Sequence, residues 1–282
     1  MRFAASLFAI LLSLPGQAGA ELAEFPARAA EARRLVIYSS LDTDLARPLI
    51  EAFQGLNPDV AVRYEDLLTG QLHDRIVAES LAGGKTADFA FSSAMDLQVK
   101  LANDGYAQAI VTPDTPDWPD WANWRDTAYA LTFEPAVFAY HKPSFADHPP
   151  PGTRADLMRW MAERPTTAQG RVGTYDIARS GVGYLFLARD QELYPGIWAV
   201  ISAMGRAGVQ QYPTSGELLA RIADGRIAVG YNLLGSYAAE WARQHEDVGL
   251  ILPRDFTVVV SRVALVPEAA AAPELGPHSW PF

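Results

Sequence analysis

Leu35-Val36-Ile37-Tyr38-Ser39-Ser40 is a short apolar run that ends in a pair of serines. Such a run is typical of a strand buried in a parallel sheet. Ala87-Asp88-Phe89-Ala90-Phe91-Ser92-Ser93 has the same form, a brief apolar strand followed by a serine pair. Between the two runs, residues 45–56 and 70–81 have helical periodicity, and residues 60–64 alternate as a strand does. This order of strands and helices predicts an α/β fold.

A second unit of the same kind follows along the chain. Residues 171–175 and 227–231 read as strands, and a long helix is expected through Leu185 and Leu187. A final apolar stretch at 256–266 has the β-branched content of one or two strands. We therefore expect two α/β lobes. The expected boundaries are a first lobe of residues 34–133 plus 250–268, a second lobe of residues 134–249, and an irregular tail at 269–282.

The first twenty residues have the features of a targeting segment. Met1-Arg2 is a short basic start, residues 3–14 are apolar apart from two serines, and Ala18-Gly19-Ala20 has the small-x-small form that signal peptidase requires. About twelve apolar residues are too few to span roughly 30 Å of hydrocarbon as a helix. We expect residues 1–20 to be a cleaved signal peptide and the protein to be periplasmic; a buried N-terminal helix or an uncleaved anchor is the alternative.

The amino-acid composition and the absence of certain motifs exclude several kinds of site and partner. The 282 residues include no cysteine, which excludes disulfides, iron–sulfur clusters, thiolate zinc sites and cysteine nucleophiles. A formal net charge of −10, with 23 Lys and Arg against 33 Asp and Glu, argues against nucleic acid as a partner. There is no G-x-S-x-G elbow, and none of the five histidines belongs to an H-E-x-x-H motif. We expect no enzyme activity, no cofactor and no metal.

The sharpest local pattern is Ser180-Gly181-Val182-Gly183, between a predicted strand and a predicted helix. Backbone N–H groups at a helix start favour anions, and glycine lets a ligand approach the backbone. Arg179 stands beside this turn and can fork onto a carboxylate or phosphate. The pattern fits neither a P-loop nor a dinucleotide fingerprint. The alternative is a purely structural role, in which Ser180 only caps the helix and the glycines allow tight packing.

Other candidates follow from strand ends. Ligands of open parallel sheets gather outside the carboxyl ends of the strands, where both serine pairs fall. We therefore expect a rim of polar side chains that belongs to one binding site. Its members are Ser39, Ser40, Ser92 and Ser93, then Tyr175 and Asp176 after the 171–175 strand, Ser215 in a hydroxyl-rich turn, and Tyr231 and Asn232 after the 227–231 strand.

The succession of Leu35–Ser39, Ala87–Ser93 and Gly173-Thr174-Tyr175-Asp176 with Ser180–Gly183 resembles periplasmic solute-binding proteins of ABC importers. It is most similar to the ferric-ion-binding branch and its relatives that take phosphorylated ligands, over about residues 35–268. The resemblance implies a type II periplasmic binding protein fold, with two lobes, a hinge and a ligand cleft between them. It also implies an ABC permease in the inner membrane as partner, and we expect the protein to be a monomer.

Two departures from that family bear on the ligand and on the tail. Ferric-binding members carry adjacent tyrosines where this chain has Leu233-Leu234, and Ser92-Ser93 lacks their carboxylate. We therefore expect a metal-free site for a small anionic organic solute such as a sugar phosphate. A ferric-iron carrier and a sensing partner of a membrane histidine kinase are the alternatives. The proline-rich tail replaces several C-terminal helices of the family, so we expect those helices to be missing and apolar surface on the first lobe to lose its cover.

Overall fold

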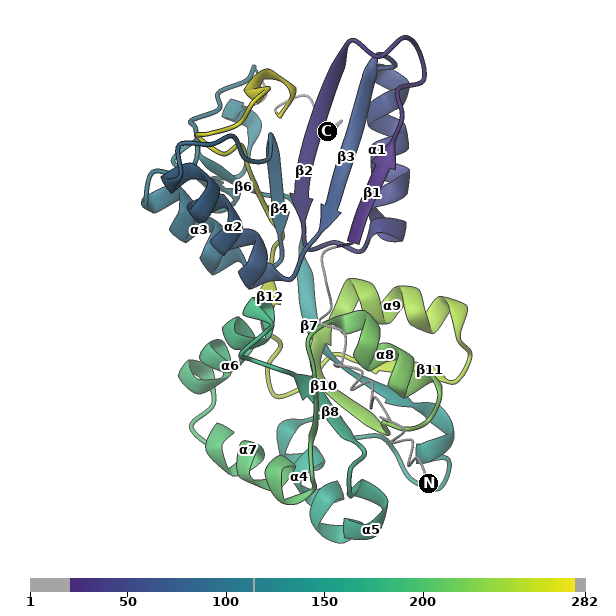
Figure 1. Ribbon diagram of the computed structural model, residues 1–282. Coiled ribbons are helices and arrows are strands. Elements are labelled where there is room, and N and C mark those ends of the chain that lie inside the picture. The colour runs from purple at the N-terminus through teal and green to yellow at the C-terminus, as the bar shows by residue number, and fades with distance from the viewer. Residues whose placement is uncertain (1–20, 114, 277–282) are drawn as a thin grey trace, which may run out of the picture.

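The computed structural model describes residues 21–113 and 115–276 and consists of two α/β lobes, one above the other in Figure 1. The expected signal peptide and the last six residues of the expected tail lie outside this description. The first lobe contains the two strand-plus-serine stretches, and the second contains the Ser180 turn. The two-lobed α/β prediction is therefore confirmed within the described residues.

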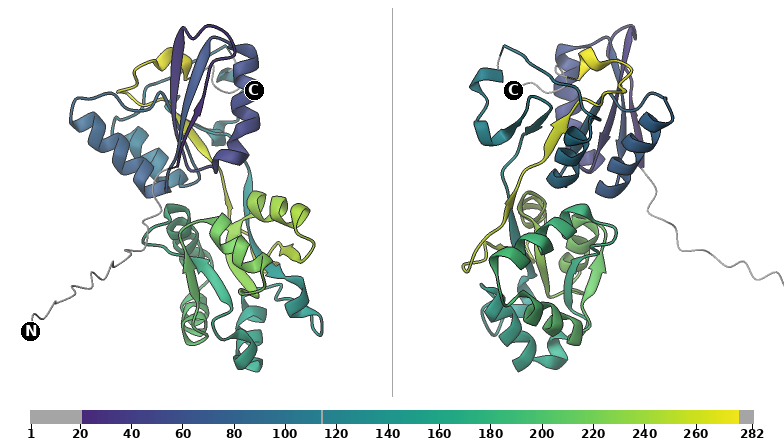
Figure 2. Two further views of the ribbon diagram at one scale, coloured as in Figure 1. Left: turned by 45° about the vertical axis from the view of Figure 1, so that its right-hand side comes forward. Right: turned by 90° about the vertical axis from the view of Figure 1, so that its left-hand side faces the viewer.

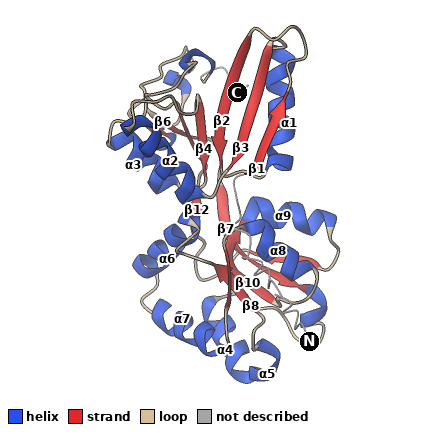
Figure 3. Cartoon of the chain, in the orientation of Figure 1, coloured by secondary structure: helices blue, strands red, loops and turns tan. Residues whose placement is uncertain are grey.

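A mixed sheet forms the centre of the first lobe. Its strands in the described residues are β1 (Glu21–Phe25), β2 (Arg33–Ser39), β3 (Val60–Asp66), β4 (Phe89–Ser92), β5 (Asn123–Trp124), β6 (Ala128–Ala130) and β13 (Val263–Leu265), in the order β1-β3-β2-β4-β13-β6-β5. Its helices are α1 (Thr43–Leu56), α2 (Thr69–Leu81) and α3 (Met95–Asn103). β2, β3 and β4 are parallel, so their carboxyl ends meet at the edge that faces the second lobe (Figure 3).

A second mixed sheet forms the lower lobe. Its strands are β7 (Glu134–His141), β8 (Val172–Tyr175), β9 (Gln210–Tyr212), β10 (Val229–Leu234), β11 (Val248–Ile251) and β12 (Val259–Val260), with the order β11-β7-β10-β8-β9 and β12 beside β7. Its helices are α4 (Arg154–Glu163), α5 (Pro165–Ala168), α6 (Gly181–Leu193), α7 (Ile197–Arg206), α8 (Ser215–Ala223) and α9 (Gly235–Gln244). α6 contains Leu185 and Leu187, as expected, and it ends before Pro195-Gly196, after which α7 begins.

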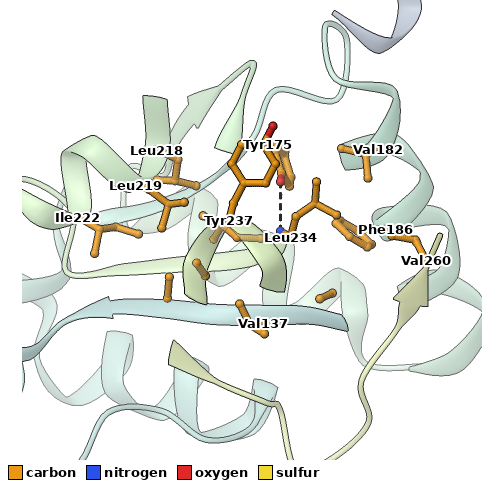
Figure 4. Close-up of a cluster of buried hydrophobic side chains, with 14 of the residues drawn as sticks. Val137, Tyr175, Val182, Phe186, Leu218, Leu219, Ile222, Leu234, Tyr237 and Val260 are labelled. Carbon is orange, nitrogen blue, oxygen red and sulfur yellow. Dashed lines mark hydrogen bonds between the residues drawn. The ribbon is translucent and has the colours of Figure 1, made fainter. Parts of the chain in front are cut away.

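The core of the second lobe reaches the surface that faces the first. Leu218, Leu219 and Ile222 of α8 pack with Leu234 of β10 and with Tyr175 of β8 (Figure 4). The Leu234 N–H donates to the Tyr175 hydroxyl at 3.3 Å, which satisfies a polar atom within an otherwise apolar cluster. The packing therefore fixes the position of a phenol at the top of this lobe.

Two chain segments join the lobes and run antiparallel to each other, as Figure 2 shows for the strand leading into β7 and the strand leading into β13. The Leu131 N–H donates to the Arg262 carbonyl at 2.9 Å, and the Arg262 N–H donates to Thr132 Oγ1 at 2.8 Å. The expected boundary at residue 250 is early, because β11 and β12 both pair with β7 of the second lobe. The chain therefore returns to the first lobe at 261–262.

The described part of the expected tail is attached to the first lobe. The N–H groups of Ala271 and Ala272 donate to Asp88 Oδ1 at 2.9 and 2.6 Å, and Leu275 is buried. A short 3-10 helix spans Pro273–Leu275, so this part is more ordered than the expected irregular tail. An apolar cavity of about 110 Å³ lies beside Gly276.

A buried ionic network holds α4 against the rest of the second lobe. Arg154 is fully buried; its Nη2 donates to Asp190 Oδ1 at 2.8 Å and its Nη1 donates to Asp255 Oδ1 at 3.1 Å. Asp190 is itself fully buried and also accepts from Tyr231 and Asn232. Removing one partner of such a network leaves an uncompensated buried charge.

The substitution Arg154→Ala should therefore lower the free energy of unfolding by about 3–5 kcal/mol, measured by urea denaturation. The matched control is Arg159→Ala on the same helix, because Arg159 pairs with Asp156 while largely exposed. The control should change the free energy of unfolding by about 0.5 kcal/mol or less. Equal losses in the two variants would contradict the ionic account of this lobe.

Candidate functional site between the lobes

A polar cleft of about 50 Å³ lies where the two lobes meet. Its walls come from the carboxyl ends of β2, β3 and β4 above and from the starts of α6, α8 and α9 below. The residues that line it are Ser40, Asp42, Asp66, Leu67, Leu68, Thr69, Ser93, Tyr175, Ser180, Val182, Pro213, Thr214, Ser215, Leu234, Tyr237 and Arg262.

The upper wall brings together one serine from each predicted pair. Ser40 and Ser93 line the cleft, with their hydroxyl oxygens 3.4 Å apart, and the Ser93 N–H donates to Ser40 Oγ at 3.1 Å. Ser39 and Ser92 are buried behind them, where their hydroxyls accept from the N–H groups two residues ahead. Within each pair, only the second serine therefore faces the cleft.

The lower wall carries hydroxyls on helix starts. Ser180 caps α6, because its Oγ accepts from the Gly183 N–H at 3.3 Å, and it also lines the cleft together with Val182. The Tyr175 hydroxyl lies 2.6 Å from Ser215 Oγ, and burial raises the pKa of Tyr175 to about 12. These hydroxyls are therefore neutral donors and acceptors around physiological pH.

Arg262 lies at the back of the cleft, on the segment that returns to the first lobe. Its Nε is 3.1 Å from Glu134 Oε1, and its Nη1 donates to the Ser40 carbonyl at 3.2 Å. Among the residues that the structure describes, its Nη2 has no hydrogen-bond partner, although the side chain is 97% buried. A buried guanidinium N–H without an acceptor is costly, so this nitrogen is a candidate donor to a ligand.

Contacts across the cleft hold the lobes in a closed arrangement. The Gly181 N–H donates to Thr69 Oγ1 at 2.7 Å, and the Tyr237 hydroxyl donates to Asp42 Oδ1 at 2.7 Å. A Cβ at Gly181 would lie 2.9 Å from Thr69 Oγ1, which shows how closely the chains approach there. The N–H of Gly181 is therefore engaged by the opposite lobe rather than open to a ligand.

Two carboxylates also face the cleft. Asp66 ends β3 and Asp42 precedes α1, and both line the cleft with Arg262. Burial, assisted by the negative charges of Asp42 and Glu21, raises the pKa of Asp66 to about 7. The cleft therefore presents one unpaired cationic nitrogen together with carboxylates of its own.

Besides Ser39, Ser92 and Gly181, four further predicted residues do not line the cleft. Arg179 is exposed on the surface, and Asp176 is used in the turn before α6, where its Oδ1 accepts from the Ala178 N–H. Tyr231 and Asn232 point into the interior of the second lobe, where both donate to Asp190 Oδ2 at 2.6 Å. β10 continues beyond the predicted strand end at residue 231 to Leu234, and it is Leu234 that lines the cleft.

Five residues line the cleft that the sequence patterns do not predict there: Asp42, Asp66, Thr69, Tyr237 and Arg262. Asp66 follows the same strand-end rule that found the serines, so the rule applied to β3 would have found it. Arg262 was detectable as the one basic residue within an apolar stretch. Thr69 and Tyr237 reach the cleft only through the way the lobes meet.

In residues 21–113 and 115–276, no group of three His, Asp or Glu side chains is placed so that it could hold a metal ion. Over the same residues, no helix is both long and apolar enough to cross a lipid bilayer. Leu233 and Leu234, which the resemblance matches to the tyrosines of ferric-binding proteins, are buried.

Two α/β lobes with two crossing segments and a polar cleft between them constitute the type II periplasmic binding protein fold, as predicted. The fold also matches solved structures. The substrate-binding protein of an ABC transporter from Agrobacterium tumefaciens is 60% identical, with a TM-score of 0.92 over 94% of this chain and 78% of that chain. AfuA of Actinobacillus pleuropneumoniae with fructose-6-phosphate bound is 17% identical (TM-score 0.73; 87% and 77% covered). Iron-bound HitA of Pseudomonas aeruginosa is 18% identical (TM-score 0.67; 87% and 78% covered).

The sequence model of bacterial extracellular solute-binding proteins matches residues 39–187, more than half of the chain. The chain therefore belongs to the family of bacterial extracellular solute-binding proteins. No curated protein sequence matches the chain significantly. The resemblance drawn from the strand and serine patterns is thus confirmed at the level of family and fold.

The raised pKa of Asp66 predicts a pH-dependent cost to stability. A carboxyl whose pKa is raised by folding does not lower the free energy of unfolding while it is protonated in both the folded and the unfolded protein. The loss of stability grows as pH rises from about 4 to about 7. Asp66→Asn should therefore be more stable than the wild type at about pH 8, with the difference shrinking toward about pH 4, as measured by urea unfolding. Glu51→Gln, an exposed change on α1, should show no such trend. A pH-independent difference for Asp66→Asn would contradict the assignment.

Proposed function

We propose that the protein is the periplasmic substrate-binding component of an ABC importer and that it captures a small anionic organic solute by closing its lobes. The observation that carries this proposal is Nη2 of Arg262, a buried cationic donor without a partner among the described residues, at the back of the interlobe cleft. A carboxylate or phosphate oxygen is the acceptor that best matches a guanidinium.

Hydroxyls near Arg262 complete a set of donors for such a group. Ser40 and Ser93 approach from the first lobe, and Ser180 and Ser215 from the second. Ser180 stands at the N-terminus of the thirteen-residue helix α6, where the helix dipole favours negative charge. The volume of about 50 Å³ admits a group of phosphate or carboxylate size between the closed lobes.

Closure is supported by the hydrogen bonds that join the lobes. Tyr237 to Asp42 and Gly181 to Thr69 form only when the lobes meet, and a bound solute would add its own contacts to both walls. Hinge closure about two crossing segments is a common way to enclose a ligand. The 60% identical ABC substrate-binding protein supports the importer role, and sugar phosphate binding by AfuA, at 17% identity, agrees with the anionic ligand class.

Ligation of ferric iron is less well supported by the side chains present. Leu233 and Leu234 offer no ligand atoms where the resembling iron carriers have tyrosines. Burial raises the pKa of both cleft phenols, Tyr175 and Tyr237, which opposes the phenolate form that iron prefers.

Ferric citrate added to the protein should therefore give no visible tyrosinate-to-iron charge-transfer band, as measured by absorption spectroscopy. A band that appears in the wild type and disappears in Tyr237→Phe would restore the iron alternative.

The role of the α6 start is tested by Ser180→Asp. Aspartate is also a good N-cap, so the helix should persist, while its charge should repel an anion in the cleft. We expect the wild type to gain several degrees in melting temperature with fructose 6-phosphate, citrate or inorganic phosphate at saturating concentration. The variant should keep its circular dichroism spectrum and lose that gain.

The matched control is Thr153→Asp, which places the same charge at the N-cap of α4, outside the cleft. It should keep the ligand-dependent gain of the wild type. Unchanged affinity in Ser180→Asp would remove the α6 start from the site. Absence of stabilisation of the wild type by every anion tested would overturn the proposed function itself.

A further inference from the structure

A second cavity adjoins the cleft and has a different chemistry. It measures about 340 Å³, and it shares Asp42, Asp66 and Tyr237 with the cleft, so the two spaces meet at these side chains. Like the cleft, it lies between the lobes, with β3 and α1 on one side and α9 on the other. A solute held at Arg262 would reach this space past the shared side chains, where the Tyr237 hydroxyl donates to Asp42.

The lining of this second cavity is strongly acidic. Glu21, Asp42, Asp44, Asp66 and Glu240 all contribute, and no Lys, Arg or His among the described residues lines it. Arg47 pairs with Asp44 and Arg243 pairs with Glu240, so Asp42 and Asp66 are the carboxylates that would most directly repel a purely anionic solute here. The charges of the cavity therefore require cationic or donor-rich chemistry in the part of the solute that occupies it.

Two further observations point to a ligand at this place. Thr43 lines the acidic cavity, is 95% buried, and its Oγ1 has no hydrogen-bond partner in the described part of the chain. In the adjoining cleft, Nη2 of Arg262 also has no hydrogen-bond partner among the described residues. Each space therefore contains a buried polar group without a hydrogen-bond partner. In the cleft it is a guanidinium N–H donor, and in the acidic cavity it is a hydroxyl among carboxylates.

Charge balance across both spaces leads to the same conclusion. Glu134 already offsets Arg262 through the contact at Nε, so Asp42 and Asp66 leave the combined site short of positive charge. An anion alone would make that imbalance worse, whereas a solute with charges of both signs would correct it. We propose that the solute is a zwitterion whose anionic group binds at Arg262 and whose protonated amine lies in the acidic cavity. This inference rests on the proposed function, which it narrows to one substrate class.

The test compares matched pairs of probes that differ by an amine. Phosphoethanolamine is compared with ethyl phosphate, and β-alanine with propionate, by isothermal titration calorimetry of the wild type at about pH 8, where Asp66 is mostly ionised. In at least one pair, we expect the amine to bind about tenfold more tightly, since one charge pair in a partly buried site is worth that much or more.

Variants assign that preference to the cavity. Asp66→Asn and Asp42→Asn should each reduce the tenfold preference several-fold, measured as the ratio of the two dissociation constants within each probe pair. The exposed control Glu51→Gln should keep the full preference.

Three outcomes separate the claims. If the anion binds and the added amine gives no advantage, the zwitterion inference is wrong while the proposed anion-binding function stands. If the amine's advantage survives in both Asn variants, the acidic cavity is not its site and the inference is again wrong. If none of the four probes binds at millimolar concentration, both the inference and the anionic ligand class fail.

Discussion

The buried ion pair between Arg262 and Glu134 stands where the chain crosses between the lobes in both directions. Glu134 begins β7 on the outward crossing, and Arg262 lies on the return crossing, with their side chains 4% and 3% exposed. Such a pair adds little net stability, because desolvation offsets its attraction. The pair instead fixes the position of the Arg262 guanidinium at the back of the cleft, where Nη2 remains available to a solute.

The position of that guanidinium connects binding with lobe movement. Arg262 donates to the carbonyl of Ser40 in the first lobe, and its guanidinium carbon lies 5.5 Å from the ring centre of Tyr237 in the second. Tyr237 in turn bonds Asp42 across the cleft. A solute on Arg262 would therefore touch the hinge and both walls at once. The acidic cavity beside the cleft then limits which solutes are compatible with closure.

Much of the architecture could be predicted from the sequence because buried parallel strands leave a strong apolar signal. β2, β4 and β8 were found in this way, whereas β1 and β9 were not, since Glu21–Phe25 and Gln210–Tyr212 are short edge strands with polar residues. The strand-end rule placed Ser40 and Ser93 at the cleft. It misplaced Tyr231 and Asn232, because β10 runs on past them through an irregular register. Arg262 and Tyr237 owe their place to contacts between segments far apart in the chain, and no local pattern encodes such contacts.

The most direct test of the central claim is a crystal structure of the protein with a solute in the interlobe cleft. The account predicts an anionic oxygen within about 3 Å of Arg262 Nη2, the distance of a charge-assisted hydrogen bond. It also predicts that Glu134 keeps its contact at Nε of the same guanidinium. A solute bound with no contact to Arg262, or a protein side chain filling that hydrogen-bond position in the bound state, would contradict it.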